Sequence, residues 1–293
     1  MADVEISYRY RNGLSDNPRQ FPADAQVARA RLEAGNEAFA ELLSSLETST
    51  LDVRRIEIPL DARDVGIVVP GLEQTPSQRP FAAILGCSDA RVPTELLFGE
   101  GPNDLFVVRV AGNVLGHDVL GSLRYAAHHL PLRCIVVLGH SGCGAVTAAV
   151  DMFLNPSEVL GIATDHEQRG LLSHMLLSVH AASRTLTKVH GEAARAQPGW
   201  RGALIELSVA VNAAAAAYAI ERDIAALGDG HSIRCLHGVY VIESRRVCSA
   251  DADVGERRGL APTPPSKDAF KMDFAALAMA PRIKALLATR VPS

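Results

Sequence analysis

The stretch that decides the fold is ILGCSDARVP, residues 84–93. A short apolar run ends here in a thiol, a carboxylate and a guanidinium, carried by Cys87, Asp89 and Arg91. Continuous apolar runs of this length are typical of buried strands in parallel sheets. Ligands gather at the carboxyl ends of such strands. We therefore expect this stretch to be a sheet strand that presents polar side chains at its end.

Further apolar runs alternate with helical patterns along the middle of the chain. The predicted strands are Phe81–Gly86, Leu105–Val110, Cys134–Gly139 and Ile233–Ile242, and the predicted helices are Leu120–Leu130, Ala145–Leu154 and Ala203–Leu227. Runs rich in β-branched residues that alternate with helices indicate a parallel sheet covered on both faces. The sequence therefore predicts an α/β fold with a mostly parallel central sheet flanked by helices.

The two ends of the chain are predicted to be additions to this fold. Residues 1–25 look irregular, a helix is expected at Gln26–Leu43, and an edge strand is expected within Ile56–Val69. The stretch APTPPSKD (residues 261–268) reads as a linker before an amphipathic helix at Phe270–Ala288. The predicted domains are an N-terminal arm and helix (1–50), an α/β domain that carries the site (51–248) and a C-terminal extension (249–293).

Charge and composition narrow the classes of partner. The formal net charge of −4 gives no basic surface for nucleic acid or anionic membranes. The first residues, MADVEISYRYRN, lack a long apolar segment, and the longest apolar runs belong to predicted strands and an Ala-rich helix. We expect a cytoplasmic protein without nucleic-acid or membrane partners. The five cysteines are an odd number without framework spacing, which favours thiols or metal ligands over disulfides.

A second informative stretch is GHSGCGAV, residues 139–146. Its His140 and Cys143 lie in one glycine-rich turn after a predicted strand, so both side chains can converge on one ion. Cys87, from another strand end, completes a Cys2His set. Thiolate sulfur and imidazole nitrogen suit zinc, and three protein ligands leave a fourth tetrahedral position open, as in catalytic sites. We predict one Zn²⁺ per chain at these residues.

Each motif also has a plain structural explanation. A single cysteine at a strand end is usually a packing residue, and an H-x-x-C spacing alone is a weak motif. The spacing of Asp89 and Arg91 permits a simple turn clamp. It also permits a two-pronged salt bridge that fixes the carboxylate and lowers its pKa. Such a carboxylate could orient the nucleophile on the metal, or could itself bind the metal and close the site. The coincidence of all these groups at two predicted strand ends favours the metal site.

These residues resemble the β-class carbonic anhydrases. The C-S-D-x-R turn of that family appears as CSDAR, and its G-H-x-x-C-G turn appears as GHSGCG. Flanking segments agree as well: QRP before the first turn, DLFVVRVAGN after it, SLRYA before the second turn and AGNEAF near the N-terminus. The resemblance covers roughly residues 27–248 and is strongest in 78–149.

The resemblance implies roles for individual residues in the reversible hydration of CO2. Cys87, His140 and Cys143 match the zinc ligands, and Asp89 with Arg91 matches the catalytic dyad. The implied substrate-binding residues are Gln78, which would orient CO2, the pocket walls Phe106 and Tyr125, and Gly144. The family also implies a homodimer or a multiple of dimers, because its pocket is completed across a subunit interface.

Some features depart from the family pattern. Val110 stands where an asparagine is common, Ala111 replaces a pocket valine, and Ile84 occupies the position of a tryptophan that some members use to bind regulatory bicarbonate.

The ligand set also predicts how activity depends on pH. Two thiolates cancel the charge of Zn²⁺, so we expect a weaker Lewis acid than a zinc on three histidines and activity that rises toward alkaline pH.

Two other functions remain open at this point. A hydrolase of COS or CS2 with the same fold would share the metal ligands and differ in its access route. A non-catalytic, zinc-stabilised scaffold module would instead dock to partners through the C-terminal extension, although a purely structural site would not need the Asp89–Arg91 pair.

Overall fold

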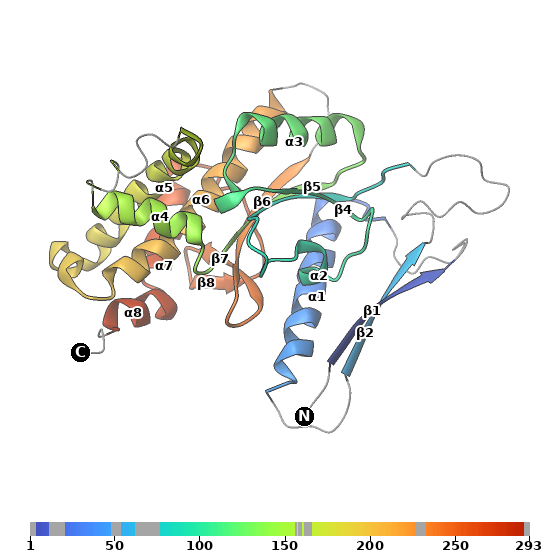
Figure 1. Cartoon of the computed structure of the whole chain (residues 1–293), viewed down its shortest axis with the longest axis horizontal. Coiled ribbons are helices and arrows are strands. Elements are labelled where there is room, and N and C mark those ends of the chain that lie inside the picture. Colours follow the sequence, from blue (N-terminus) through green and yellow to red (C-terminus); the bar gives the residue numbers. More distant parts are fainter. Residues whose placement is uncertain are drawn as a thin grey trace.

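The computed structural model describes residues 4–11, 21–47, 54–61, 77–155, 157, 160, 166–226 and 233–289. A seven-stranded sheet with the order β4-β3-β5-β6-β7-β8 lies at the centre, and β9 pairs with β6 (Figure 1). Its strands are β3 (Ala82–Gly86), β4 (Leu105–Arg109), β5 (Cys134–His140), β6 (Arg234–Val241), β7 (Arg246–Asp251), β8 (Gly255–Arg258) and β9 (Ala261–Pro262). The first four are parallel, and every pairing that involves β7, β8 or β9 is antiparallel. The predicted α/β fold is confirmed, with a mixed sheet.

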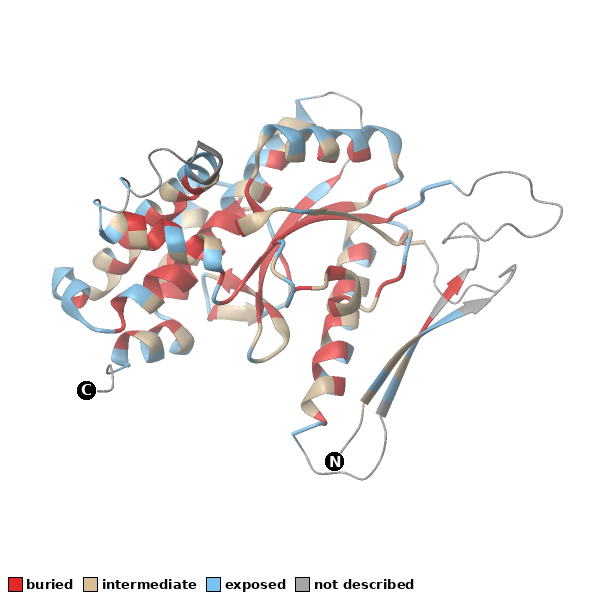
Figure 2. Cartoon of the chain, in the orientation of Figure 1, coloured by how far each residue is buried: buried red, intermediate tan, exposed pale blue. Residues whose placement is uncertain are grey.

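Helices cover both faces of the parallel strands because successive strand residues point to opposite faces. On one face, Ile84 of β3 packs with α1 (Ala25–Ser44) and α2 (Thr94–Leu97). On the other face, Leu85 packs with α3 (His117–His129) and α6 (Trp200–Ala225). Figure 2 shows the buried core as a continuous band along these strands.

A second core lies among helices beside the sheet. It joins α4 (Gly144–Leu154), α5 (His166–His190), α6, α7 (Lys267–Ala278) and α8 (Pro281–Ala288). Two short 3-10 helices, η2 (Ala111–Asn113) and η4 (Glu192–Ala196), complete the chain's described helices.

Helix α6 is long and apolar enough to cross a membrane, but 78% of its apolar window is buried inside the fold. Its apolar surface therefore serves as the contact between the two cores.

The N-terminal region differs from its prediction in one respect. The helix expected at Gln26–Leu43 is confirmed as α1, which begins after Asp24, whose carboxylate accepts a hydrogen bond from the amide of Val27. Residues 4–11 are not irregular but form strand β1 (Val4–Arg11), paired in parallel with β2 (Arg54–Asp61). The edge strand expected within Ile56–Val69 is therefore present as far as Asp61, and residues 62–69 lie outside the described part of the chain.

The C-terminal region is part of the fold rather than an appended segment. Strand β7 crosses the domain boundary predicted between residues 248 and 249, and β8 continues the same sheet. The expected linker at 261–268 holds β9 and the start of α7, whose N-cap is Ser266. The single helix expected at Phe270–Ala288 is two helices, because Pro281 begins α8. Phe274 of α7 is buried in the helical core, so this segment packs on its own domain.

Candidate metal centre

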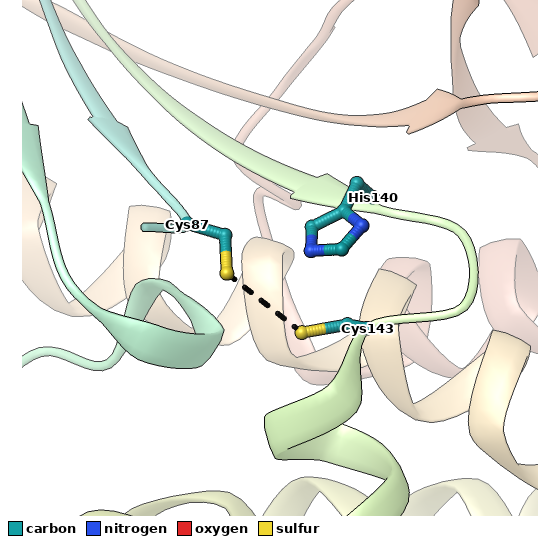
Figure 3. A group of neighbouring side chains, drawn as sticks. All are labelled: Cys87, His140 and Cys143. Atoms are coloured by element: carbon teal, nitrogen blue, oxygen red, sulfur yellow. Dashed lines mark hydrogen bonds between the residues drawn. The ribbon is translucent and has the colours of Figure 1, made fainter. Parts of the chain in front are cut away.

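The two motif turns meet at one end of the sheet. Strands β3 and β5 are parallel neighbours, with Gly86 opposite Leu138, so both end at the same edge. Cys87 follows β3 directly, His140 is the last residue of β5, and Cys143 is the N-cap of α4. Figure 3 shows the three side chains pointing toward one another from these elements.

The three side chains form a compact donor set. Their ligand atoms lie within 4.8 Å of one another, and all three residues are buried. The sulfurs of Cys87 and Cys143 are 4.0 Å apart. Two zinc–sulfur bonds of about 2.3 Å at a tetrahedral angle put the sulfurs about 3.8 Å apart, so the observed separation is close to that of a zinc-bound pair.

The histidine ring is oriented as a metal ligand. Nδ1 of His140 lies 3.0 Å from the carbonyl oxygen of Ser141, which defines it as the protonated nitrogen that donates to that carbonyl. This leaves the lone pair on Nε2, which is buried and has no hydrogen-bond partner among the described residues. A buried polar atom without a partner is costly unless something binds it. The donor set therefore fits a borderline-soft metal ion such as zinc.

The two thiols are electrostatically distinct. Hydrogen bonding from Cys143 is the main cause that lowers the pKa of Cys87, and the backbone amide of Gly112, 3.3 Å from its sulfur, adds to this. The neighbouring Cys87 and burial together raise the pKa of Cys143. Cys87 thus loses its proton readily. Cys143 keeps its proton, because losing it would place two negatively charged thiolates side by side. A cation bound between the sulfurs would remove the repulsion between them.

The Asp89–Arg91 pair forms as the motif predicts. Nε and Nη2 of Arg91 donate to the two carboxylate oxygens at 3.0 and 2.7 Å, and the backbone amide of Arg91 donates to Oδ1 at 2.9 Å. These bonds hold the pKa of Asp89 well below its usual range. Oδ2 lies 3.8 Å from Nε2 of His140, so the ionised carboxylate borders the donor set.

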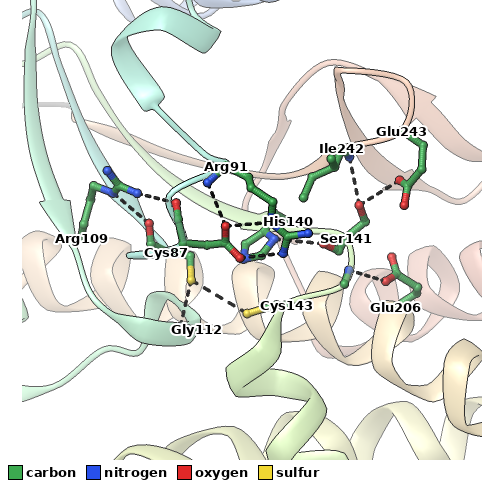
Figure 4. Close-up of polar contacts among 12 residues, drawn as sticks. Cys87, Arg91, Arg109, Gly112, His140, Ser141, Cys143, Glu206, Ile242 and Glu243 are labelled. Atoms are coloured by element: carbon green, nitrogen blue, oxygen red, sulfur yellow. Dashed lines mark hydrogen bonds and ion pairs between the residues drawn. The ribbon is translucent and has the colours of Figure 1, made fainter.

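Several supporting residues were not predicted from the sequence. The guanidinium of Arg109 donates to the carbonyl oxygens of Cys87 and Asp89 at 2.9 and 2.6 Å, which fixes the first turn. In the second turn the hydroxyl of Ser141 donates to Glu243. The backbone amide of Gly142 donates to Glu206 at 2.8 Å. Figure 4 shows these contacts around the donor set. The partners are 20 to 102 residues apart in the sequence, so no local motif indicates these contacts.

The predicted substrate-binding residues lie in different places. Gly144 begins α4, directly after Cys143. Phe106 pairs with Ala83, four residues before Cys87 and therefore toward the other end of β3. Gln78 is exposed and precedes the same strand. Tyr125 is 51% exposed on α3. A single chain does not gather the last three around the donor set, and their roles stay predictions.

The sequence and structure of the chain were compared with those of known proteins. The family model described as carbonic anhydrase matches residues 82–228, which is half of the chain. The chain belongs to the β-class carbonic anhydrase family. All five residues Cys87, Asp89, Arg91, His140 and Cys143 lie inside the matched segment.

Individual carbonic anhydrases match over shorter segments. The chain is 53% identical over 76 residues to a carbonic anhydrase of Mycolicibacterium smegmatis, which is 26% of this chain and 37% of that protein. It is 46% identical over 77 residues to a carbonic anhydrase of Pseudomonas aeruginosa, covering 24% and 35% of the two chains. The aligned segments thus span little more than a third of these curated relatives.

Solved β-carbonic anhydrases are also similar. A chain from one of two tetrameric β-carbonic anhydrases of Sordaria macrospora matches with a TM-score of 0.45 and 22% identity, over 58% of this chain and 80% of that one. The β-carbonic anhydrase CcaA matches with a TM-score of 0.45 and 25% identity, over 60% and 81% of the two chains.

Proposed function

We propose that this protein is a zinc-dependent carbonic anhydrase that converts CO2 and water reversibly into bicarbonate and a proton. The observation that carries the proposal is the buried Cys87–His140–Cys143 donor set beside the ionised Asp89. Family membership supports the same reaction. The residues that would hold the zinc are these three, one ion per chain.

A zinc ion bound here would supply Lewis acidity and a water-derived nucleophile at near-neutral pH. The chain's own contribution is orientation. Arg91 fixes both carboxylate oxygens of Asp89, and an ionised carboxylate accepts hydrogen bonds only. Asp89 would therefore hold the proton of the nucleophile on its own side, which leaves the reactive lone pair directed at the carbon of CO2.

The sheet end also excludes water from the reacting atoms. His140 and Cys143 are 0% and 1% exposed, and Val114 and Val146 belong to the same buried cluster as the two cysteines. A water-poor environment strengthens the electrostatic interactions of the site. Apolar CO2 loses little on entering such an environment, whereas the bicarbonate product is better solvated outside it.

The remaining pocket groups would come from a second copy of the chain. Gln78 and Phe106 lie toward the opposite end of the strands from Cys87, so their expected roles require another subunit. Strand β4 is an edge of the sheet, with β3 as its neighbour on the other side. We propose a homodimer or a multiple of dimers on this basis, and the expected cytoplasmic location stays a prediction.

The test is stopped-flow CO2 hydration on zinc-quantified protein between pH 7 and 9. Cys143→Ser should lose zinc and hydration together, while Cys248→Ser, a partly buried thiol outside the donor set, should keep both. Hydration should rise with pH, because two thiolates make the zinc a weak Lewis acid. One zinc per chain with no hydration at any pH would refute the proposed reaction and direct attention to COS and CS2.

A further inference from the structure

We propose that Arg282, on the C-terminal helix α8, is a positioning residue of the metal turn. The inference rests on the zinc site proposed above and extends it to a part of the chain outside the family match, which ends at residue 228. The metal turn is the segment from His140 to Cys143.

The metal turn depends on one unusual backbone position. Gly142 has φ +61°, in the left-handed region, and this conformation brings His140 and Cys143 to the same ion site. Glycine does not hold itself in this region, because it adopts positive and negative φ about equally well. Ser141, beside it, is held by Tyr240, Ile242 and Glu243. The amide of Gly142 itself is held by Glu206 of α6, since it donates to Oε1 at 2.8 Å.

Glu206 is in turn oriented by Arg282. Its second oxygen, Oε2, accepts from Nη1 of Arg282 at 2.6 Å. Arg282 also donates two hydrogen bonds to Glu256 of β8. Its Nε and Nη2 lie 3.0 and 2.7 Å from the same oxygen, Oε1. The contacts therefore run without a gap from β8 through α8 and α6 to the metal turn.

The burial of this network makes Arg282 necessary for the orientation of Glu206. The side chain of Glu206 is 10% exposed, and that of Arg282 is 23% exposed. Breaking a buried ion pair by removing one partner leaves an uncompensated charge, which is strongly unfavourable. Without Arg282, the Glu206 carboxylate gains by turning toward water, and the amide of Gly142 loses its acceptor.

The expected consequence is weaker metal binding. Without its hydrogen bond to Glu206, the Gly142 amide no longer restrains the metal turn, which then samples more conformations. Metal binding must order the turn again, and this entropic cost lowers the affinity. Loss of groups that orient metal ligands typically lowers metal affinity by 10- to 100-fold. Arg282 is one step farther from the ligands, so we expect the low end of this range, about tenfold.

The chain offers a matched control in Arg31. Arg31 also bridges two carboxylates, Glu100 at 2.9 Å and Asp104 at 2.9 Å, and its side chain is 19% exposed. It belongs to α1 and lies over the ring of Phe81, which precedes β3 and is therefore at the other end of the strand from Cys87. Arg31→Met removes a comparable buried network without touching the metal turn.

The experiment measures zinc dissociation constants of the full-length protein by competition with a chromophoric chelator. Wild type, Arg282→Met and Arg31→Met are compared, each with its thermal midpoint in the metal-free form. Cobalt-substituted samples give a second readout through the ligand-field absorption bands, which report ligand geometry. We expect a zinc dissociation constant about tenfold higher and shifted cobalt bands in Arg282→Met alone.

The outcomes separate this inference from the proposed site. A wild type that binds no zinc overturns both. A wild type that binds zinc, with Arg282→Met binding equally well, overturns only the role of Arg282, as does an equal loss of affinity in Arg31→Met. If Arg282→Met does not fold, Arg282→Lys replaces it: lysine keeps one charge but cannot reach both carboxylates, so unchanged affinity and cobalt bands in that variant also overturn the role.

Discussion

Asp89 and Arg91 lie two residues apart in one turn and face each other through two side-chain hydrogen bonds of 3.0 and 2.7 Å. Arg91 is itself largely exposed, whereas Asp89 borders the buried donor set. The pair therefore links a solvent-facing cation to the orientation of a carboxylate beside the proposed zinc.

Replacement of Arg91 with methionine should lower kcat/KM for CO2 hydration by about 100-fold, the scale of a misplaced catalytic group. The released Asp89 carboxylate, 3.8 Å from Nε2 of His140, can turn into the donor set and compete with the nucleophile. Stopped-flow hydration and zinc content are the measurements. Zinc content should stay at one per chain, and Arg91→Lys should recover part of the rate. An unchanged rate in Arg91→Met would contradict the role given to the pair.

Metal removal should make one of the two ligand thiols reactive. In zinc-loaded protein we expect iodoacetamide to leave Cys87 and Cys143 unmodified, because both sulfurs bind the ion. After chelation Cys87 should react, because its neighbours lower its pKa, whereas Cys143 keeps its proton and should react little. Mass spectrometry of peptides would locate the label. Cys134 is the internal control, because its burial in β5 raises its pKa to about 12 and keeps it unreactive in either state. Equal labelling of Cys87 with and without zinc would argue against the donor set.

The two glycines of the second turn should respond differently to alanine. A Cβ at Gly142 or Gly144 meets no atom within 4 Å, so sterics do not distinguish them. Gly142 has φ +61°, and a non-glycine residue there costs about 1–2 kcal/mol. Gly144 begins helix α4, where alanine is favoured by up to about 1 kcal/mol. Urea unfolding of the metal-free variants should show Gly142→Ala less stable than wild type and Gly144→Ala at least as stable.

His237 should make the fold sensitive to acid. Burial lowers the pKa of this β6 side chain from 6.5 to about 4. Between these values the unfolded chain binds more protons than the folded one, so the stability from neutral His237 is complete above pH 6.5 and is lost as the pH falls toward 4.

The expected loss from this residue between pH 7.5 and pH 5 is about 2 kcal/mol in the free energy of unfolding. Urea unfolding of wild type and His237→Gln at both pH values checks this, since other groups contribute equally to both proteins. The pH-dependent difference should shrink by that amount in the variant. Parallel curves for the two proteins would show that His237 is not buried in its neutral form.

The parts of the fold that could be predicted are those with a local signal. The run AAILG of β3 and the run CIVVLGH of β5 are buried at every position, so continuous apolarity was enough to identify them. The Asp89–Arg91 pair and the His140–Cys143 pair could be predicted because each depends on close spacing within one turn. Cys87 could be joined to them because it ends a predicted neighbouring strand.

Other elements were not predicted from the sequence. Some of them carry a periodic apolar pattern, and others carry no pattern at all. Helix α5 was not predicted, although its buried Leu172, Met175, Val179, Ala182 and Leu186 recur at helical spacing. Strand β1 alternates apolar and polar residues, but its partner β2 begins 50 residues later, at Arg54 opposite Val4. Strand β8, with the sequence GERR, has no apolar pattern, because it is defined by antiparallel pairing with β7. Long-range contacts of this kind also place Glu206 beside Gly142.

The burial of β3 and β5 affects the rate at which a bound ion would dissociate. Both strands lie between other strands of the sheet, and they carry Cys87 and His140 at their ends. Backbone segments of this kind open only when the whole domain unfolds, unlike loops, which open locally many times before that. Local opening of the backbone would then contribute little to release of the ion, because the strands that carry two of its three ligands separate only when the protein loses its tertiary structure.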